Sequence, residues 1–302
     1  MANAVAITNT KNPSWREYLE LCKPKVVLLL LVTAVVGMQL ASPNWVPIGT
    51  VIIATIGIGF AASSAAVINH IVDASIDAKM QRTKRRPIVS GNMTNLRALA
   101  FSAVLGISSM LILVIFVNPL TAVLSLVGLI GYAVIYTMFL KHATPQNIVI
   151  GGLAGALPPL IGWAAITNTV SSEGILLVLI IFTWTPAHFW ALAIDRIDDY
   201  KKADVPMLPV THGIEFTKTC VLVYSLALWV VSVIPFVVGM SGSLYLICAA
   251  GLGGWFSYYA WQLKYRPKAD TAIKTFMVSV KYLLYLFSAL LVDHYLTMMS
   301  NL

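Results

Sequence analysis

Charged residues are scarce in this sequence. Asp, Glu, Lys and Arg make up 11% of the 302 residues, whereas hydrophobic residues make up 59%, and the mean hydropathy is +0.83. An ordinary soluble domain carries about 25% charged residues. The scarcity therefore excludes a soluble protein and a disordered chain, and it indicates an integral membrane protein.

Cysteine is also scarce. Cys22, Cys220 and Cys248 are the three cysteines, and they show no C-x-x-C spacing, so neither a thiolate metal site nor a disulfide framework is predicted. We interpret them as packing residues. The apolar runs are continuous rather than alternating, which excludes an outer-membrane β-barrel.

Nine apolar segments are long enough to cross a bilayer as helices, which takes ~20 residues each. We predict an all-α fold, a polytopic membrane helical bundle of about nine transmembrane helices that forms a single domain over residues 1–302. The spans are 25–41, 47–68, 95–117, 120–140, 146–167, 174–194, 218–239, 242–263 and 273–297.

Lys and Arg are distributed unevenly between the connections. The connections around Pro43, Asn118, Asn168 and Ser241 contain none. Because positive residues mark cytoplasmic loops, we predict an N-in, C-out topology in the plasma (inner) membrane.

The N-terminal residues 1–24 lack the apolar core and cleavage site of a secretory signal. We expect a short interfacial helix there, around Trp15 and Leu19. Two larger cytoplasmic connections, 72–94 and 195–217, hold most of the acidic residues, so we expect the chemistry in these two loops.

The second span ends with polar side chains at helical spacing. Asn69, Asp73 and Asp77 stand at i, i+4 and i+8, so they drift only about 40° per step around a helix and line one face. We call these three residues the oxygen ladder. Such a face is costly beside a bilayer unless a cation joins it, and oxygen ligands suit Mg²⁺.

Five cations lie within residues 79–86, directly after the oxygen ladder. Taken alone, they are explained as well by a topology signal or by a patch for anionic lipid. Next to bound Mg²⁺, however, arginines such as Arg82 and Arg86 would hold the free oxygens of a diphosphate.

The second large loop contains Asp195, Asp198 and Asp199, followed by Lys202. Asp195 and Asp199 are again i and i+4, and a second carboxylate set would let a second Mg²⁺ neutralise a departing diphosphate. A solvated, charged loop is the alternative interpretation.

Three further features lie within the spans. His188 follows Pro186 near the inner end of the sixth span; it is either a hydrogen-bonded packing residue or a ligand or base. Lys281 either snorkels to the surface or pairs with an anion in a cavity. The Gly- and Pro-rich fifth span, with Gly162 and the pair Pro158–Pro159, predicts close helix packing.

Several of these patterns together resemble a known family. N-x-x-x-D-x-x-x-D over 69–77, followed by R-T-x-x-R-P over 82–87, resembles the first aspartate-rich motif of the UbiA-type intramembrane prenyltransferases. P-x-H-F-W-A-L-A over 186–193 and D-Y at 199–200, leading to P-M-L-P over 206–209, are similar to the branch of that family that acts on haem. The resemblance covers nearly the whole chain.

The resemblance implies a helical bundle around a cavity that opens into membrane lipid. It implies transfer of a farnesyl group from farnesyl diphosphate to a vinyl group of haem b, with water addition, giving haem O and diphosphate. Two Mg²⁺ ions would serve as cofactors, and haem b would be a substrate rather than a cofactor. A haem A synthase or a terminal oxidase assembly is an implied partner, and no nucleic acid is expected.

The resemblance also implies roles for individual residues. It makes Asp199 the firmest member of the second motif, with Asp195 and Asp198 less secure, and His188 a catalytic contact to haem, as axial ligand or as proton acceptor. The candidate metal ligands are Asn69, Asp73, Asp77, Asp195 and Asp199. The resemblance places Arg82 and Arg86 on the diphosphate, and we add Lys84, Lys202 and Lys281 as candidate substrate-binding residues.

Two alternatives remain open. A prenyltransferase of the same kind could use another acceptor, such as a hydroxybenzoate or a chlorin. The chain could instead be a transporter that uses intramembrane acids as an ion path. Its acids cluster at one membrane face, however, whereas transporter sites lie near the bilayer midplane.

Overall fold

The computed structural model describes residues 13–300, and every regular element in that range is a helix. The all-α prediction is therefore confirmed, and each expected span corresponds to helical structure within a few residues. The long elements are α2 (Pro24–Leu40), α3 (Ile48–Val72), α5 (Asn95–Phe116), α6 (Pro119–Ile130) with η1 (Gly131–Leu140), α8 (Asn147–Ala156) with α9 (Pro158–Thr167), α10 (Ser172–Asp195), α13 (Ile214–Val237), α14 (Ser243–Tyr265) and α15 (Thr271–Ser300).

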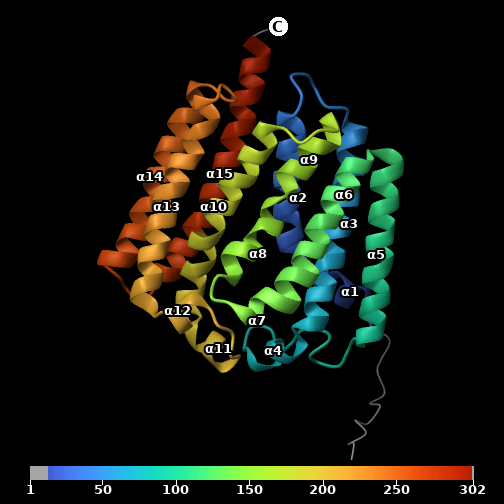
Figure 1. Ribbon diagram of the computed structural model, residues 1–302, viewed down its shortest axis with the longest axis vertical. Coiled ribbons are helices and arrows are strands. Elements are labelled where there is room, and N and C mark those ends of the chain that lie inside the picture. The colour runs from blue at the N-terminus through green and yellow to red at the C-terminus, as the bar shows by residue number, and fades with distance from the viewer. Residues whose placement is uncertain (1–12, 301–302) are drawn as a thin grey trace, which may run out of the picture.

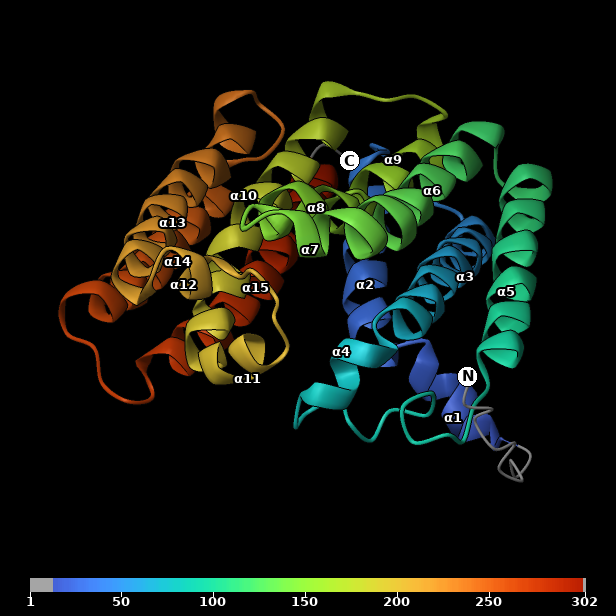
Figure 2. The ribbon, with the colours of Figure 1, turned by 60° about the horizontal axis from the view of Figure 1, so that its bottom comes forward.

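Short helices gather at one end of the bundle, opposite the end where the C-terminus lies (Figures 1 and 2). We call the end with the short helices the site end. The connections that carry the two charged segments of the sequence lie there. The short helices are α1 (Trp15–Leu21), α4 (Ala74–Lys79), α7 (Lys141–Ala143), α11 (Ile197–Lys202) and α12 (Leu208–Thr211).

Most of the long helices have the length and hydropathy of membrane spans. Within residues 13–300, seven spans pass both criteria, and the pair α1 and α2, bent by 55°, passes as a unit. Helix α14 is not among them, because its sequence mixes Ser, Gly, Gln and Lys with its apolar residues. The structure thus supports seven or eight spans, and the count of nine stays a prediction.

The connections that lack Lys and Arg meet at the end opposite the site end. There Trp45 stacks on Tyr295 with ring centroids 4.7 Å apart. The backbone N–H of Gly242 donates to Asp293 Oδ2 at 2.6 Å. The connections around residues 43 and 241 border one cavity of about 510 Å³, as expected if consecutive long helices alternate in direction.

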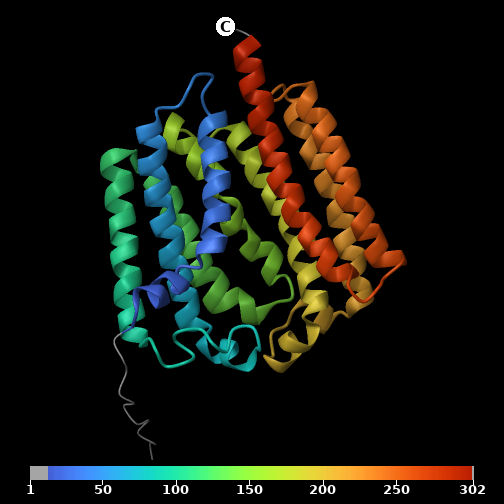
Figure 3. The same ribbon diagram turned by 180° about the vertical axis from the view of Figure 1, so that it is seen from behind.

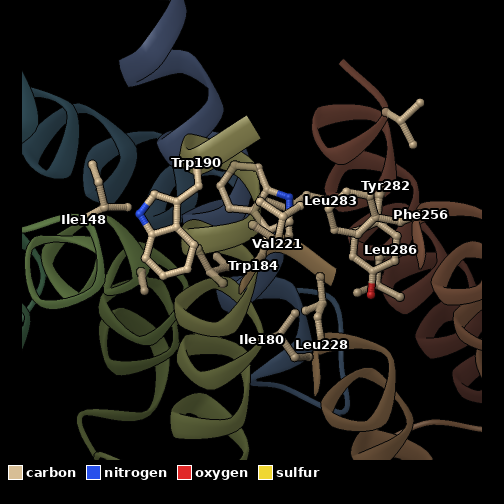
Figure 4. Close-up of a cluster of buried hydrophobic side chains, with 14 of the residues drawn as sticks. Ile148, Ile180, Trp184, Trp190, Val221, Leu228, Phe256, Tyr282, Leu283 and Leu286 are labelled. Atoms are coloured by element: carbon tan, nitrogen blue, oxygen red, sulfur yellow. The ribbon is translucent and has the colours of Figure 1, made fainter. Parts of the chain in front are cut away.

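Two packed groups of helices form the bundle. Helices α10, α13, α14 and α15 lie side by side in the two opposite views of Figures 1 and 3, and α2, α3, α5, α6 and α9 form the other group. In the first group, Phe256 of α14 packs against Tyr282 of α15, while Trp190 of α10 lies on the side of Ile148 (Figure 4). Large apolar side chains on the outer surface, such as Ile115 of α5, are exposed, as a lipid-facing surface requires.

Glycines allow α2 and α9 to touch backbone to backbone. A Cβ added at Gly162 would lie 2.0 Å from the carbonyl oxygen of Ala34, and one added at Gly37 would lie 2.0 Å from that of Pro159. No side chain fits in either place. This contact explains Gly162 of the fifth span, and the pair Pro158–Pro159 starts α9 directly after a break in that span.

Candidate active site

The oxygen ladder lies at the site end, where α3 passes into α4. The Asp73 N–H donates to Asn69 O at 2.9 Å, and the Asp77 N–H donates to Asp73 O at 2.8 Å. Helical spacing therefore continues through the junction at Asp73. All three residues are only 3–4% exposed, so their oxygens lie within the protein.

Two lysines and a hydroxyl from three other segments contact the first two ladder residues. Lys23, just before α2, donates to Asn69 Oδ1, and Lys141 Nζ of α7 lies 2.6 Å from Asp73 Oδ2. The Asn69 amide in turn donates to Asp73 Oδ2 at 2.8 Å and to Thr137 Oγ1 of η1 at 3.2 Å. A buried carboxylate requires such partners, because desolvating an unpaired charge costs several kcal/mol.

The basic segment folds back onto the last ladder residue. Arg86 Nη1 lies 2.5 Å from Asp77 Oδ2, and the Thr83 hydroxyl donates to the backbone oxygen of Asp77 at 3.0 Å. The structure therefore joins Arg86 to the oxygen ladder. Arg82 and Lys84 are exposed and lie at the rim of the site.

Sequence reasoning missed Lys23, Thr137 and Lys141. A single lysine at the inner end of a span looks like a topology signal, so neither lysine stood out. Thr137 belongs to η1, a π-helical segment in which its hydroxyl donates to Tyr132 O at 2.7 Å. Such segments are frequent at functional sites, but their presence in a long apolar span was not evident from the sequence.

The second charged loop approaches the first. Lys79 Nζ lies 3.0 Å from Asp204 Oδ2; because both side chains are exposed, the pair contributes little stability. Tyr200 of α11 is close to Arg82. Burial raises the pKa of the Tyr200 phenol, and Arg82 partly opposes this effect, so Tyr200 remains a hydrogen-bond donor at neutral pH.

The acids of the second loop do not join the oxygen ladder in a shared metal site. Asp195 pairs with its neighbour Arg196, with Oδ2 3.0 Å from Nε. Asp198 and Lys202 are exposed, and Asp199 is half-buried. In the described range, no group of three or more His, Cys, Asp or Glu side chains is arranged to hold a metal ion. The roles of Asp195 and Asp199 as ligands of a second ion therefore stay a prediction.

The oxygen ladder by itself fits Mg²⁺ chemically. Its donors are carboxylate and amide oxygens, which a hard divalent cation prefers. Asp73 Oδ1 is buried and accepts no hydrogen bond from the described residues, so one carboxylate oxygen remains for a ligand. In the protein alone, Lys141 and Arg86 balance the charges of Asp73 and Asp77.

His188 lies apart from the ladder, inside α10. Its Nδ1 lies 2.7 Å from Ser279 Oγ of α15, and its ring stacks on Trp184 and Phe276 at centroid distances of 4.1 and 4.5 Å. The sequence left open whether His188 is a packing residue or a reactive one. The structure shows a buried, oriented imidazole.

Lys281 takes the first of the two arrangements considered for it, and no contact in the described range supports its candidacy for substrate binding. Its side chain is exposed on the outer surface of α15, and no contact among the described residues links it to the ladder. A cation in this position snorkels along the helix surface.

His70, next to Asn69, is buried, and neither of its ring nitrogens has a hydrogen-bond partner in the described range.

A membrane bundle with a buried oxygen ladder and cations at its mouth is the arrangement of an intramembrane enzyme that acts on diphosphates. The model of the UbiA prenyltransferase family matches residues 30–288, and the chain belongs to this family. It is 55% identical over 289 residues to Protoheme IX farnesyltransferase of Idiomarina loihiensis, covering 96% of this chain and 97% of that protein. It is 53% identical over 298 residues to Protoheme IX farnesyltransferase of Shewanella oneidensis, covering 98% and 99%.

Solved structures resemble the fold as well. Digeranylgeranylglyceryl phosphate synthase superposes with a TM-score of 0.78 at 22% identity, covering 92% of this chain and 98% of that one. A UbiA homolog from Archaeoglobus fulgidus bound to DMAPP and Mg²⁺ has a TM-score of 0.67 at 16% identity, covering 91% and 99%. At these identities the likeness shows the fold alone.

Proposed function

We propose that this protein transfers a farnesyl group from farnesyl diphosphate to a vinyl group of haem b, with addition of water, to give haem O and diphosphate. The observation that carries the proposal is the buried oxygen ladder with Lys23, Lys141 and Arg86 held against it. The choice of haem as acceptor rests on full-length relatives at 53–55% identity that bear the name Protoheme IX farnesyltransferase.

The oxygen ladder is the proposed Mg²⁺ site, with Asn69, Asp73 and Asp77 as ligands. When bound, the ion supplies positive charge that stabilises diphosphate as a leaving group. The free Oδ1 of Asp73 supports this role. Asp199, and Asp195 less securely, are the proposed ligands of a second ion, because the loop that carries them meets the first loop through Lys79 and Asp204.

The cations beside the ladder are the proposed diphosphate contacts. Lys23, Lys141 and Arg86 are already held in position by their carboxylate and amide partners, so they lose little side-chain freedom when an anion arrives. A guanidinium also matches phosphate oxygens in a bidentate manner. Arg82, Lys84 and Lys202 would attract the substrate from the rim, whereas Lys281 is left out of this proposal because it lies on the outer surface of α15.

His188 is the proposed contact to haem, since its imidazole is buried and oriented inside the bundle. The site end is proposed to face the cytoplasm of a plasma (inner) membrane, because the basic residues concentrate there. The product would pass to a haem A synthase or a terminal oxidase assembly.

The test is direct. Purified protein with Mg²⁺, farnesyl diphosphate and haem b should yield a haem that is about 222 Da heavier, the mass of one farnesyl group plus one hydroxyl group, the hydroxyl coming from water. Omitting Mg²⁺ should abolish this product. Haem-loaded protein that never forms it would contradict the proposal, and a prenylated hydroxybenzoate formed in its place would identify a different acceptor. Ion-driven uptake into vesicles without diphosphate release would instead indicate a transporter.

A further inference from the structure

The hydrogen bonds around Ser279 determine which nitrogen of His188 carries a proton. The Ser279 hydroxyl donates to the carbonyl oxygen of Phe276 at 2.6 Å. A hydroxyl has one hydrogen, so toward His188 Nδ1, 2.7 Å away, Ser279 Oγ can only accept. Nδ1 therefore carries the N–H, and in a neutral imidazole Nε2 carries the lone pair.

The His188 ring is also fixed in orientation. It lies between Trp184, at 20° to its plane, and Phe276, at 27°, and Phe189 meets it edge-on at 4.8 Å. Trp184 Nε1 donates to the backbone oxygen of Ser279 at 2.8 Å. Ser279 therefore holds both the imidazole and one of the rings stacked on it, so a flip that exchanges the two nitrogens would break the Nδ1 bond.

The second nitrogen, Nε2, is left for a ligand. It has no hydrogen bond to any described residue, yet it is not among the buried side-chain atoms that lack a partner, so a small part of its surface stays accessible. His188 keeps 6% of its surface exposed. A histidine that binds a metal through one nitrogen almost always donates its other N–H to a fixed acceptor, which is the arrangement here.

We propose that Ser279 is a positioning residue that holds His188 as the Nδ1–H tautomer, so that Nε2 binds the iron of the haem substrate. The inference rests on the proposed function, because it takes haem as the acceptor. It decides between the two roles left open for His188, axial ligand and proton acceptor. The Nε2 lone pair is the iron ligand, and the Ser279 hydroxyl fixes the direction in which that lone pair points.

The experiment uses the purified full-length protein and haem b, in ferric and ferrous form. Absorption and electron paramagnetic resonance spectra should show imidazole ligation in the wild type. His188→Gly should lose this signature and regain it when free imidazole is added. Ser279→Ala should weaken haem binding by about 10- to 100-fold, the range found when a partner of a metal-bound histidine is removed, whereas Ser279→Thr, which keeps the hydroxyl, should bind like the wild type.

Metal-free protoporphyrin IX separates positioning from packing, since it has the shape of haem without the iron. Its affinity, measured by fluorescence, should be the same for the wild type, Ser279→Ala and His188→Gly. Ser288→Ala is the matched control: the Ser288 hydroxyl also bonds a carbonyl of α15, that of Leu284 at 2.9 Å, but its side chain is exposed. It should leave both affinities unchanged.

Three results would overturn the inference: a His188→Gly spectrum equal to that of the wild type, haem binding by Ser279→Ala as tight as by the wild type, or an equal loss of protoporphyrin and haem binding in Ser279→Ala. These outcomes differ from failure of the proposed function. If the wild type forms the farnesylated haem but both variants give the wild-type spectrum, only the inference about Ser279 and His188 is refuted. If the wild type neither binds nor modifies haem, both fall.

Discussion

Lys141 Nζ lies 2.6 Å from Asp73 Oδ2, and this buried ion pair connects α7 to the junction of α3 and α4. The side chains of Lys141 and Asp73 are only 15% and 4% exposed. Removing either partner would leave the other as an uncompensated charge in a poorly solvated place. Asp73 therefore contributes to the stability of the protein as well as to the proposed metal site.

The ion pair predicts that Mg²⁺ and Lys141 compensate for one another. Lys141→Met should lower the stability of the Mg²⁺-free protein by about 3 kcal/mol, because Asp73 loses its cation, and Mg²⁺ should raise the melting temperature of this variant more than that of the wild type. Thermal unfolding with and without Mg²⁺ measures both effects. Lys274→Met is the control: Lys274 pairs with Asp270 at 2.5 Å, but both side chains are more than half exposed. Equal Mg²⁺ shifts in wild type and Lys141→Met would refute the coupling.

Asp73→Asn should abolish farnesyl transfer, since it removes one of the two carboxylate charges that the ladder offers to Mg²⁺, while the side chain keeps its shape beside Asn69. The amount of membrane-inserted protein and the mass of the extracted haem are measured in the same cells. Asp198→Asn, at an exposed position of α11, should retain activity. Full activity of Asp73→Asn at saturating Mg²⁺ would rule out the ladder as the metal site.

Arg86→Gln should raise KM for farnesyl diphosphate by about tenfold or more, because a hydrogen bond between charged groups contributes ~1.5–3 kcal/mol. Loss of the 2.5 Å contact also leaves Asp77 without its cation. Steady-state kinetics at several diphosphate concentrations gives the KM. The neighbouring Arg85 is exposed, so Arg85→Gln should have a much smaller effect. If the two variants behave alike, only the overall charge of the segment matters.

Gly162→Ala should destabilise the bundle, since the new Cβ would lie 2.0 Å from Ala34 O and force α2 and α9 apart. Overpacking of this kind costs about 1–3 kcal/mol. Gly155→Ala is the matched control in the same span, because nothing lies within 4 Å of its added Cβ. Thermal unfolding and the yield of monodisperse protein compare the two. A Gly162→Ala protein as stable as Gly155→Ala would contradict the close contact of α2 and α9.

The sequence by itself determined the class of fold and the position of its long helices. Continuous apolar runs can satisfy their backbone hydrogen bonds in lipid only as helices, so the spans matched α2 through α15 within a few residues. The oxygen ladder was likewise evident from the sequence, because residues at i and i+4 lie on the same face of any helix, whatever packs around it. Arg86 was expected to bind diphosphate beside the ladder, and in the structure the short basic segment folds back so that Arg86 contacts Asp77.

Tertiary structure alone decided which distant residues complete the site. Lys23 and Lys141 reach the ladder from 46 and 68 residues away in sequence, and Ser279 reaches His188 from 91 residues away. Contacts of this kind depend on which helices pack together and on how each helix is rotated about its axis. A hydropathy pattern predicts neither of these. For the same reason Lys281, which a hydropathy plot places inside the last span, lies on its outer surface. The chemistry of the ladder is local, whereas the neutralisation of its charge is a property of the assembled bundle.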